Sequence, residues 1–343
     1  MPNPLSTTQA TLQSQQFHKR FAHICTNESG FDEAFAIQLF HFQAETNAVY
    51  KAYLQALRRD AGKIERLEDI PHLPISFFKS HAVKSHDFEA SLVFSSSGTT
   101  GMEKSRHFVH HSQLYEQVCV QLFERAYGET SNWVILALLP AYLEREGSSL
   151  IHMVDLLIRR SGHSESGFFL HNHEALCQKY QQAKHAGKKV LLLGVSFALL
   201  DLAEKRMLKL AAEDVVMETG GMKGRRKELI REELHSLLCS GLGVTRIHSE
   251  YGMTELLSQA YSQGQGLYKE APWMKVLVRD TNDPFRYLEA GRTGGLNIID
   301  LANIDSCAFI QTQDLGRKSN ENTFEVLGRF DHSDVRGCNL LAL

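Results

Sequence analysis

Short apolar runs that alternate with longer helical stretches constrain the fold of this 343-residue chain more than any other feature. Such runs predict buried strands, and amphipathic stretches predict the helices between them. The strands are expected at Ser91–Phe94, Trp133–Leu139, Lys189–Gly194 and Val215–Met217, with helices from about Ser112, over Phe197–Leu210 and over Lys223–Leu238. This alternation is typical of βαβ units, in which ligands bind at the carboxyl ends of parallel strands. The sequence therefore predicts an α/β fold of mostly parallel strands flanked by helices.

The regions on either side of this pattern differ from it. Residues 1–90 are expected to form a helical segment packed on the core. Within it, Phe31–Arg59 has apolar residues at helical spacing and no Gly or Pro, which predicts one helix. From about residue 264, short strands and turns predict a smaller antiparallel β subdomain. Residues 91–330 are thus the expected main domain, and residues 331–343 a short tail.

Composition and charge narrow the class of protein. A net charge of -3 argues against a nucleic-acid-binding surface, which needs a concentrated positive field. The first twenty residues lack an apolar core, so no signal peptide is predicted, and no segment approaches the ~18 apolar residues of a spanning helix. The six cysteines are scattered without a CxxC pair, so neither a disulfide framework nor a zinc site is indicated. These features predict a cytoplasmic protein.

The strongest single motif is the Ser/Gly/Thr-rich segment Phe94–Lys104, which follows a predicted strand. Glycine amides and hydroxyls in such a loop can surround a polyphosphate, while Lys104 neutralises its charge. The segment is not a Walker A loop, because Glu103 replaces the glycine that precedes the lysine there. The alternative is an ordinary turn.

Three further motifs follow along the chain. In Tyr251–Glu255 (YGMTE), the glycine permits a tight turn, Thr254 offers a hydroxyl to a phosphate, and Glu255 offers an oxygen ligand for Mg²⁺. The alternative for this pentapeptide is a turn in which Thr and Glu begin a helix. Gln311–Gly316 (QTQDLG) is expected to put Asp314 at a strand end, where a carboxylate can bind ribose hydroxyls. Gly328–Asp331 (GRFD) is the last motif. For a single Asp or Arg at such positions, the alternative is a turn or a surface salt bridge.

Three histidines lie close together in the sequence, at His107, His110 and His111. Helical spacing would gather them, but no carboxylate or cysteine completes a metal site nearby in the sequence. A solvated or phosphate-adjacent face is therefore expected in place of a metal centre.

Taken in order, these motifs resemble those of the adenylate-forming superfamily of acyl-CoA synthetases, peptide-synthetase adenylation domains and luciferases. The chain is most similar to its acyl-protein synthetase branch, the ligase of fatty acid reductase systems in luminous bacteria. That similarity covers residues from about 35 to the end, and its motifs are Ile70–Lys79 (IPHLPISFFK), Pro140–Leu150 (PAYLEREGSSL), Glu218–Gly224 (ETGGMKG) and Val335–Leu341 (VRGCNLL).

The resemblance implies a role for each matching residue. The β- and γ-phosphates of ATP would be held by Lys104 and by the loop residues Ser95, Ser96, Ser97, Gly98, Thr99, Thr100 and Gly101. Gly220 and Gly221 would lie along the adenine, Tyr251 would pack on the base, and Gly252 and Met253 would also belong to the nucleotide site. Thr254 would contact the α-phosphate and Glu255 would ligate Mg²⁺, while Asp314 and Arg329 would bind the ribose. Tyr142, Gly147, Ser148 and Ser149 would line the acyl pocket.

The sequence departs from the wider superfamily after Arg329. There most members continue into a small mobile lid domain whose lysine serves adenylation, and this domain is expected to be absent here. A thiolate attacks an acyl-adenylate readily, and the resemblance implies that Cys338 is the acyl acceptor. The alternative for Cys338 is an inert residue that packs the tail.

The sequence is compatible with three functions. The first is a ligase that uses ATP and Mg²⁺ to convert a fatty or aryl acid into acyl-AMP and passes the acyl group through Cys338 to a partner protein, such as a reductase or an acyl-carrier system. The second is a truncated ligase that transfers the group directly to coenzyme A or a carrier protein. The third is a non-catalytic nucleotide or acyl binder.

Overall fold

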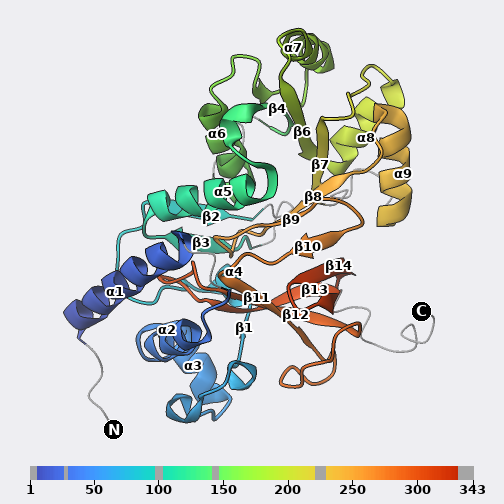
Figure 1. Ribbon diagram of the computed structural model, residues 1–343. Coiled ribbons are helices and arrows are strands. Elements are labelled where there is room, and N and C mark those ends of the chain that lie inside the picture. Colours follow the sequence, from blue (N-terminus) through green and yellow to red (C-terminus); the bar gives the residue numbers. More distant parts are fainter. Residues whose placement is uncertain (1–5, 27–29, 97–102, 141–146, 221–228, 331–343) are drawn as a thin grey trace. The chain divides into compact units, whose positions relative to one another are not determined.

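The structure is a computed structural model that describes residues 6–26, 30–96, 103–140, 147–220 and 229–330. The chain forms two compact units, which we describe one at a time (Figure 1). The first unit combines residues 1–87 with residues 272–343, and the second consists of residues 88–271. Among the described residues, none of the helices combines the length and apolar character that crossing a bilayer requires.

The second unit is built on a mixed sheet with the strand order β10-β9-β8-β7-β6-β4-β5. The strands are β4 (Trp133–Leu138), β5 (Gly167–Phe168), β6 (Lys189–Val195), β7 (Val215–Thr219), β8 (His248–Tyr251), β9 (Ala260–Ser262) and β10 (Leu267–Lys269). Strands β4 to β8 run parallel, while β9 and β10 are antiparallel to their neighbours. β4 (WVILAL) and β6 beyond Lys189 are continuous apolar runs, as strands covered on both faces require, whereas β7 (VVMET) is apolar only in its first three residues, although all five are buried.

Helices connect and cover these strands. They are α5 (Ser112–Tyr127), α6 (Ser149–Ser161), α7 (His173–His185), α8 (Ser196–Lys205) and α9 (Arg231–Leu242), with a 3₁₀ turn at Thr130–Asn132. In Figure 1, α5 and α6 lie on one side of the strands and α8 and α9 on the other. A separate antiparallel hairpin joins β2 (Leu92–Ser95) to β3 (Arg106–Val109). The α/β prediction is therefore confirmed.

The first unit pairs an antiparallel sheet with helices. Its strands are β11 (Met274–Arg279), β12 (Thr293–Asp300), β13 (Phe309–Asn320) and β14 (Thr323–Arg329), and the short β1 (Leu73–Pro74) runs parallel to β13. Its helices are α1 (Thr7–Thr26), α2 (Glu33–Thr46), α3 (Ala48–Ala56) and α4 (Phe77–Ser80), with 3₁₀ turns at Ala61–Lys63 and Leu67–Asp69. Phe309 of β13 packs against Phe40 of α2 and stacks on Tyr50 of α3, so aromatic contacts join the helices to the sheet.

Two helix predictions need correction. The expected single helix over Phe31–Arg59 is broken at Asn47, whose side chain accepts a hydrogen bond from Tyr50 N (3.0 Å) and donates one to Ser306 O (2.9 Å). That capping contact with a distant loop favours two helices over one continuous helix. The helix expected from Lys223 begins at Arg231, because Ile230 is extended, with a ψ of 153°. Residues 221–228 lie outside the described residues.

Candidate functional site

The β2–β3 hairpin forms the two ends of the expected phosphate loop. Ser95 pairs with Arg106, and beyond this pair the Ser96 N–H donates to Ser105 O (3.1 Å) while the Ser105 N–H donates to Ser96 Oγ (3.0 Å). The two residues at the ends of the loop, Ser96 and Ser105, are therefore hydrogen-bonded to each other, and the exposed Lys104 directly precedes Ser105. Five of the expected phosphate-binding residues lie outside the described part of the chain: Ser97, Gly98, Thr99, Thr100 and Gly101.

Gly147 contacts the start of this loop directly. Its carbonyl accepts a hydrogen bond from Ser95 N (2.6 Å), and its φ of +78° is a conformation that glycine adopts without strain. A Cβ at this position would lie 2.9 Å from Ser95 Oγ. The glycine thus allows the segment before α6 to approach β2 closely.

The expected acyl-pocket residues surround the first turn of α6. Ser148 caps that helix by accepting a hydrogen bond from Ile151 N (3.4 Å), and Ser149 O accepts one from the Tyr115 hydroxyl (2.8 Å). Tyr115 in turn packs against Phe94, with ring centroids 4.7 Å apart, so this corner is joined to the strand that leads into the phosphate loop. Tyr142 lies outside the described residues.

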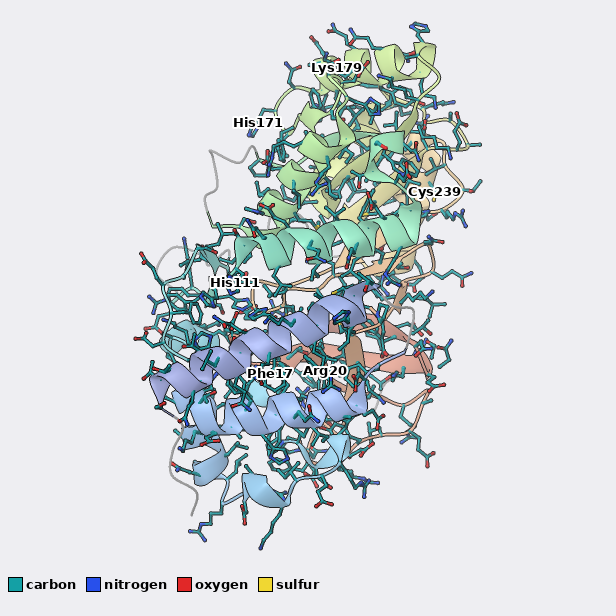
Figure 2. All side chains as sticks on the ribbon, turned by 60° about the vertical axis from the view of Figure 1, so that its left-hand side comes forward. Phe17, Arg20, His111, His171, Lys179 and Cys239 are labelled. Carbon is teal, nitrogen blue, oxygen red and sulfur yellow. The ribbon has the colours of Figure 1, made fainter. Side chains whose placement is uncertain are left out.

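The YGMTE segment forms the turn that follows β8, and a histidine joins it to the hairpin. Nδ1 of His107, on β3, lies 2.9 Å from Thr254 O. His107 is 1% exposed and Glu255 is 5% exposed. Of the two expectations for this cluster, a solvated or a phosphate-adjacent face, the solvated one is wrong for His107, because it lies on a strand, where alternate side chains point inward, and not on a helix. His111, by contrast, is exposed (Figure 2).

The paired strands β7 and β8 end at Thr219 and Tyr251, and Gly220 of the expected adenine segment directly follows β7. Thr219 pairs with Glu250 across the two strands, and its hydroxyl donates to Glu250 Oε2 (2.5 Å). Gly220 follows with a φ of +64°, and its carbonyl accepts a hydrogen bond from Ser196 Oγ (2.7 Å). Gly221 lies outside the described residues. The sequence did not single out Glu250, which is buried directly before the motif.

The two expected ribose residues belong to the first unit and face each other. Asp314 on β13 pairs with Arg329 on β14, and Arg329 Nε lies 3.4 Å from Asp314 Oδ1. Asp314 was expected at a strand end, but it lies inside the twelve-residue strand β13. The pairing with β14 shifts register between Leu315 and Gly316, next to Asp314, and such irregularities can re-aim side chains inside a strand.

Arg279 is a buried charge behind this pair that the sequence analysis missed. Its guanidinium donates to Leu296 O (2.8 Å), Asn297 Oδ1 (3.0 Å) and Thr312 O (2.8 Å). Burial lowers its pKa to about 10, and the charge of Asp314 acts in the opposite direction. In the sequence, the one indication of this buried charge is an arginine at the end of the largely apolar strand Met274–Arg279. Arg279 thus joins β11 to β12 and to β13, the strand that carries Asp314.

Four of the five described thiols have a raised pKa. Burial raises the pKa of Cys119, Cys177 and Cys239, and that of Cys307 to about 12. Cys239 is partly exposed on α9 (Figure 2). A raised pKa leaves less thiolate at neutral pH, so these four cysteines are poor candidates for acyl acceptors. Cys338 lies outside the described residues.

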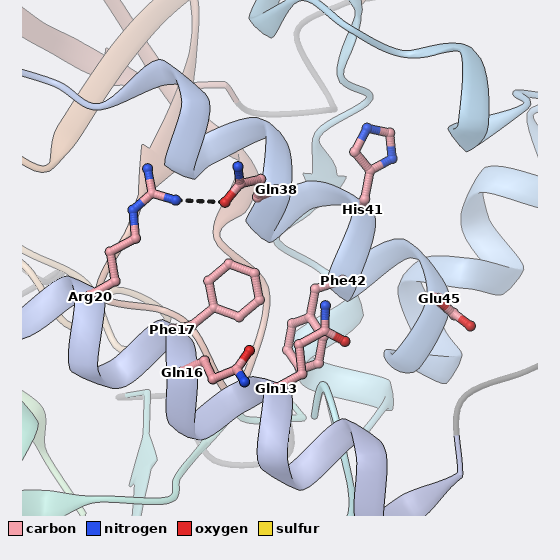
Figure 3. Close-up of a pocket in the computed structure, with 8 residues that line it drawn as sticks. All are labelled: Gln13, Gln16, Phe17, Arg20, Gln38, His41, Phe42 and Glu45. Atoms are coloured by element: carbon pink, nitrogen blue, oxygen red, sulfur yellow. Dashed lines mark hydrogen bonds between the residues drawn. The ribbon is translucent and has the colours of Figure 1, made fainter.

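A pocket of about 460 Å³ lies between α1 and α2 of the first unit and contains none of the expected site residues (Figure 3). Phe17 and Phe42 form part of its wall, with ring centroids 5.2 Å apart. Its cation, Arg20, already donates to Gln38 (2.6 Å) and Asp32 (2.8 Å). The guanidinium therefore braces α1 against α2.

No family model matches the sequence, and no curated protein matches it. Solved structures do match the fold. The chain is similar to a 2-hydroxyisobutyryl-CoA ligase in an open conformation in complex with 2-HIB-AMP and CoA, with a TM-score of 0.60 and 12% identity over 88% of this chain and 70% of that one. It is also similar to ATP-bound MatB from Rhodopseudomonas palustris, with a TM-score of 0.51 and 18% identity over 71% of this chain and 49% of that one.

These likenesses identify the fold as that of the adenylate-forming ligases, as the sequence predicted. The matching region spans about half the length of MatB.

Proposed function

We propose that the chain is an ATP-dependent ligase that converts a carboxylic acid to acyl-AMP with release of pyrophosphate. In the more specific form of this proposal, Cys338 then takes the acyl group as a thioester and passes it to a partner protein. The fold supports the first step, because one neighbour binds ATP and another binds an acyl-adenylate.

The observation that carries the proposal is a convergence within the second unit. The ends of the Ser95–Lys104 loop, the Gly147 turn and the Thr254–Glu255 turn are joined through the hydrogen bonds from Ser95 N to Gly147 O and between His107 and Thr254 O. These segments are distant in sequence; the loop and the Thr254–Glu255 turn carry groups suited to a phosphate or a cation, and the Gly147 turn belongs to the expected acyl pocket. Hydrogen bonds that bring these segments together favour a shared binding site over a set of unrelated turns.

Each residue has a distinct task in the adenylation step. The loop amides and Lys104 would hold the β- and γ-phosphates, and Thr254 would orient the α-phosphate. Gly220 and Gly221 would lie along the adenine, while Asp314 and Arg329 would bind the ribose. Glu255 fits a divalent cation because its carboxylate is the hard oxygen donor that Mg²⁺ takes. Bound there, Mg²⁺ would supply positive charge that stabilises the phosphate oxygens.

The chemistry proceeds in two displacements. A carboxylate oxygen of the acid attacks the α-phosphorus, the bond from that phosphorus to the bridging oxygen breaks, and pyrophosphate leaves. The Cys338 thiolate then attacks the acyl carbonyl, and AMP leaves as the carbon–oxygen bond breaks. Negative charge grows on the phosphate oxygens during the first step, so Lys104 and the loop amides act mainly as electrostatic stabilisers.

Direct transfer to coenzyme A is the second candidate. The 2-hydroxyisobutyryl-CoA ligase that shares the fold was solved with CoA, which favours this acceptor. The two candidates share the adenylation step and differ only in the thiol that receives the acyl group.

Intact-protein mass spectrometry tests the proposal. The wild-type chain and Cys338→Ser are incubated with ATP, Mg²⁺ and a panel of fatty and aromatic acids, with and without coenzyme A, while pyrophosphate is measured. We expect an acyl adduct on the wild type that Cys338→Ser lacks. Pyrophosphate release without an adduct, together with an acyl-CoA product, would move the acceptor to coenzyme A. No pyrophosphate and no binding of MgATP would refute the ligase and leave a non-catalytic acyl binder.

A further inference from the structure

His107 occupies a position that joins two of the nucleotide motifs. It lies on β3, opposite Phe94 of β2, and follows Lys104 by three residues. Its side chain is 1% exposed, so it does not meet solvent as the exposed His111 does. Burying an imidazole is costly unless its polar atoms are hydrogen-bonded, so the position calls for a specific contact.

That contact is with Thr254 O, 2.9 Å from His107 Nδ1. A carbonyl oxygen only accepts hydrogen bonds, so Nδ1 must carry the proton. Thr254 lies in a turn beyond the end of β8, and the turn is closed by a bond from Leu256 N to Met253 O (3.2 Å). The hydrogen bond from His107 therefore restrains the position of a backbone carbonyl that lies beyond the end of β8.

The consequence is geometric. Thr254 precedes Glu255, and both would have to face the phosphates that the Ser95–Lys104 loop holds. The hairpin that ends this loop carries His107, so a shift of the turn relative to the loop stretches the bond between Nδ1 and Thr254 O. Displacements of about 1 Å far from the reacting atoms can lower a rate about 10²-fold, so one such bond can matter for catalysis.

We propose that His107 is a positioning residue, which holds the Thr254–Glu255 turn in register with the phosphate loop by donating its Nδ1 proton to Thr254 O. This inference rests on the proposed adenylation. It concerns geometry alone, since His107 need not touch a substrate.

Three substitutions separate the donor from the bulk of the side chain. His107→Asn keeps an amide donor close to the position of Nδ1, His107→Gln places its amide closer to that of Nε2, and His107→Ala removes the donor. We expect His107→Ala and His107→Gln to lower kcat for acid-dependent ATP–pyrophosphate exchange about 10- to 100-fold. We expect His107→Asn to stay within about threefold of wild type. The Mg²⁺ concentration for half-maximal exchange should rise in His107→Ala and His107→Gln but not in His107→Asn.

His163→Ala is the matched control. It also removes a bond between a histidine and a carbonyl, from His163 Nε2 to Ser131 O (2.8 Å), in the same unit but away from the motifs. Its exchange rate should equal that of the wild type. If His107→Ala and His163→Ala lower exchange equally, or if His107→Asn is as slow as His107→Ala, the positioning role is wrong.

Calorimetry of MgATP binding without any acid keeps the two proposals distinguishable. If the wild type binds MgATP and His107→Ala equals it in both binding and exchange, the positioning role of His107 is wrong but the proposed function stands. A wild type that binds no MgATP overturns the proposed function itself. Nitrogen NMR gives an independent result, because a His107 ring without a proton on Nδ1 contradicts the inference whatever the activity.

Discussion

Arg329 Nε lies 3.4 Å from Asp314 Oδ1 across the β13–β14 pair, yet Asp314 is buried and Arg329 is exposed. The carboxylate is thus held in place, while the guanidinium reaches it from the solvent side. Because the guanidinium is exposed, solvent screens the interaction, and the pair contributes little to stability. The role that we propose for Asp314 and Arg329 is to bind the ribose, and the next substitution tests it.

Asp314→Ala should raise KM for ATP about 10- to 100-fold, because hydrogen bonds to a charged group contribute about 1.5–3 kcal/mol. The measurement is the ATP dependence of pyrophosphate exchange. Arg317→Ala breaks the ion pair of Arg317 with Glu325 (2.9 Å) on the same two strands and should leave KM unchanged. Equal KM values for Asp314→Ala and wild type would remove Asp314 from the site.

Lys104→Ala should lower the adenylation rate at least about 10²-fold, the scale of losing one transition-state stabiliser. Lys104 is exposed, so its loss should leave the thermal midpoint of unfolding unchanged. Lys209→Ala, at another exposed lysine of the second unit, is the control and should keep full activity. A Lys104→Ala variant with near-normal exchange would show that the phosphates are held by other groups.

Glu255→Gln should lower adenylation by a similar factor, because it removes the carboxylate charge but keeps the shape of a buried side chain. Exchange measured over a range of Mg²⁺ concentrations tests this, and we expect a weaker response to the cation. An unchanged Mg²⁺ dependence would rule out Glu255 as a ligand. Its thermal midpoint, compared with wild type, reports any loss of folding.

Gly147→Ala should impair both stability and adenylation. A residue with a side chain is strained at a φ of +78°, and its Cβ would lie 2.9 Å from Ser95 Oγ. Gly187→Ala is a matched control, because Gly187 has a φ of +68° but no atom within 4 Å of an added Cβ. Both variants should lose about 1 kcal/mol of folding free energy, and only Gly147→Ala should lose activity. Equal activities would show that the contact with Ser95 is unimportant.

Stability should fall as the pH drops below 6.5. Burial lowers the pKa of His72 to about 3, against its ordinary value of 6.5, so the unfolded chain binds more protons than the folded one between these two values. Between these two values, protonation of this group should lower the free energy of unfolding by about 1.4 kcal/mol for each unit by which the pH is lowered. Urea unfolding at pH 7, 6 and 5 tests the slope, which should be smaller in His72→Asn. An equal slope in that variant would contradict the assignment.

The sequence by itself predicted the features that depend on local pattern. Trp133–Leu138 and, beyond Lys189, the strand Lys189–Val195 are apolar runs that form buried parallel strands, because strands covered on both faces need apolar residues along their length. The order of the Ser/Gly loop and the YGMTE motif indicated an adenylate-forming fold, which the solved structures confirm. Spacing along the chain carried enough information for both.

Only the tertiary structure decided features that depend on residues far apart in the chain. The helix break at Asn47 follows from its bond to Ser306 O, and the significance of Arg279 follows from carbonyls on neighbouring strands. His107 resembled a solvated histidine until the fold placed Thr254 O within 2.9 Å of it. Local periodicity does not contain such contacts, because their free energy comes from partners that folding alone brings together.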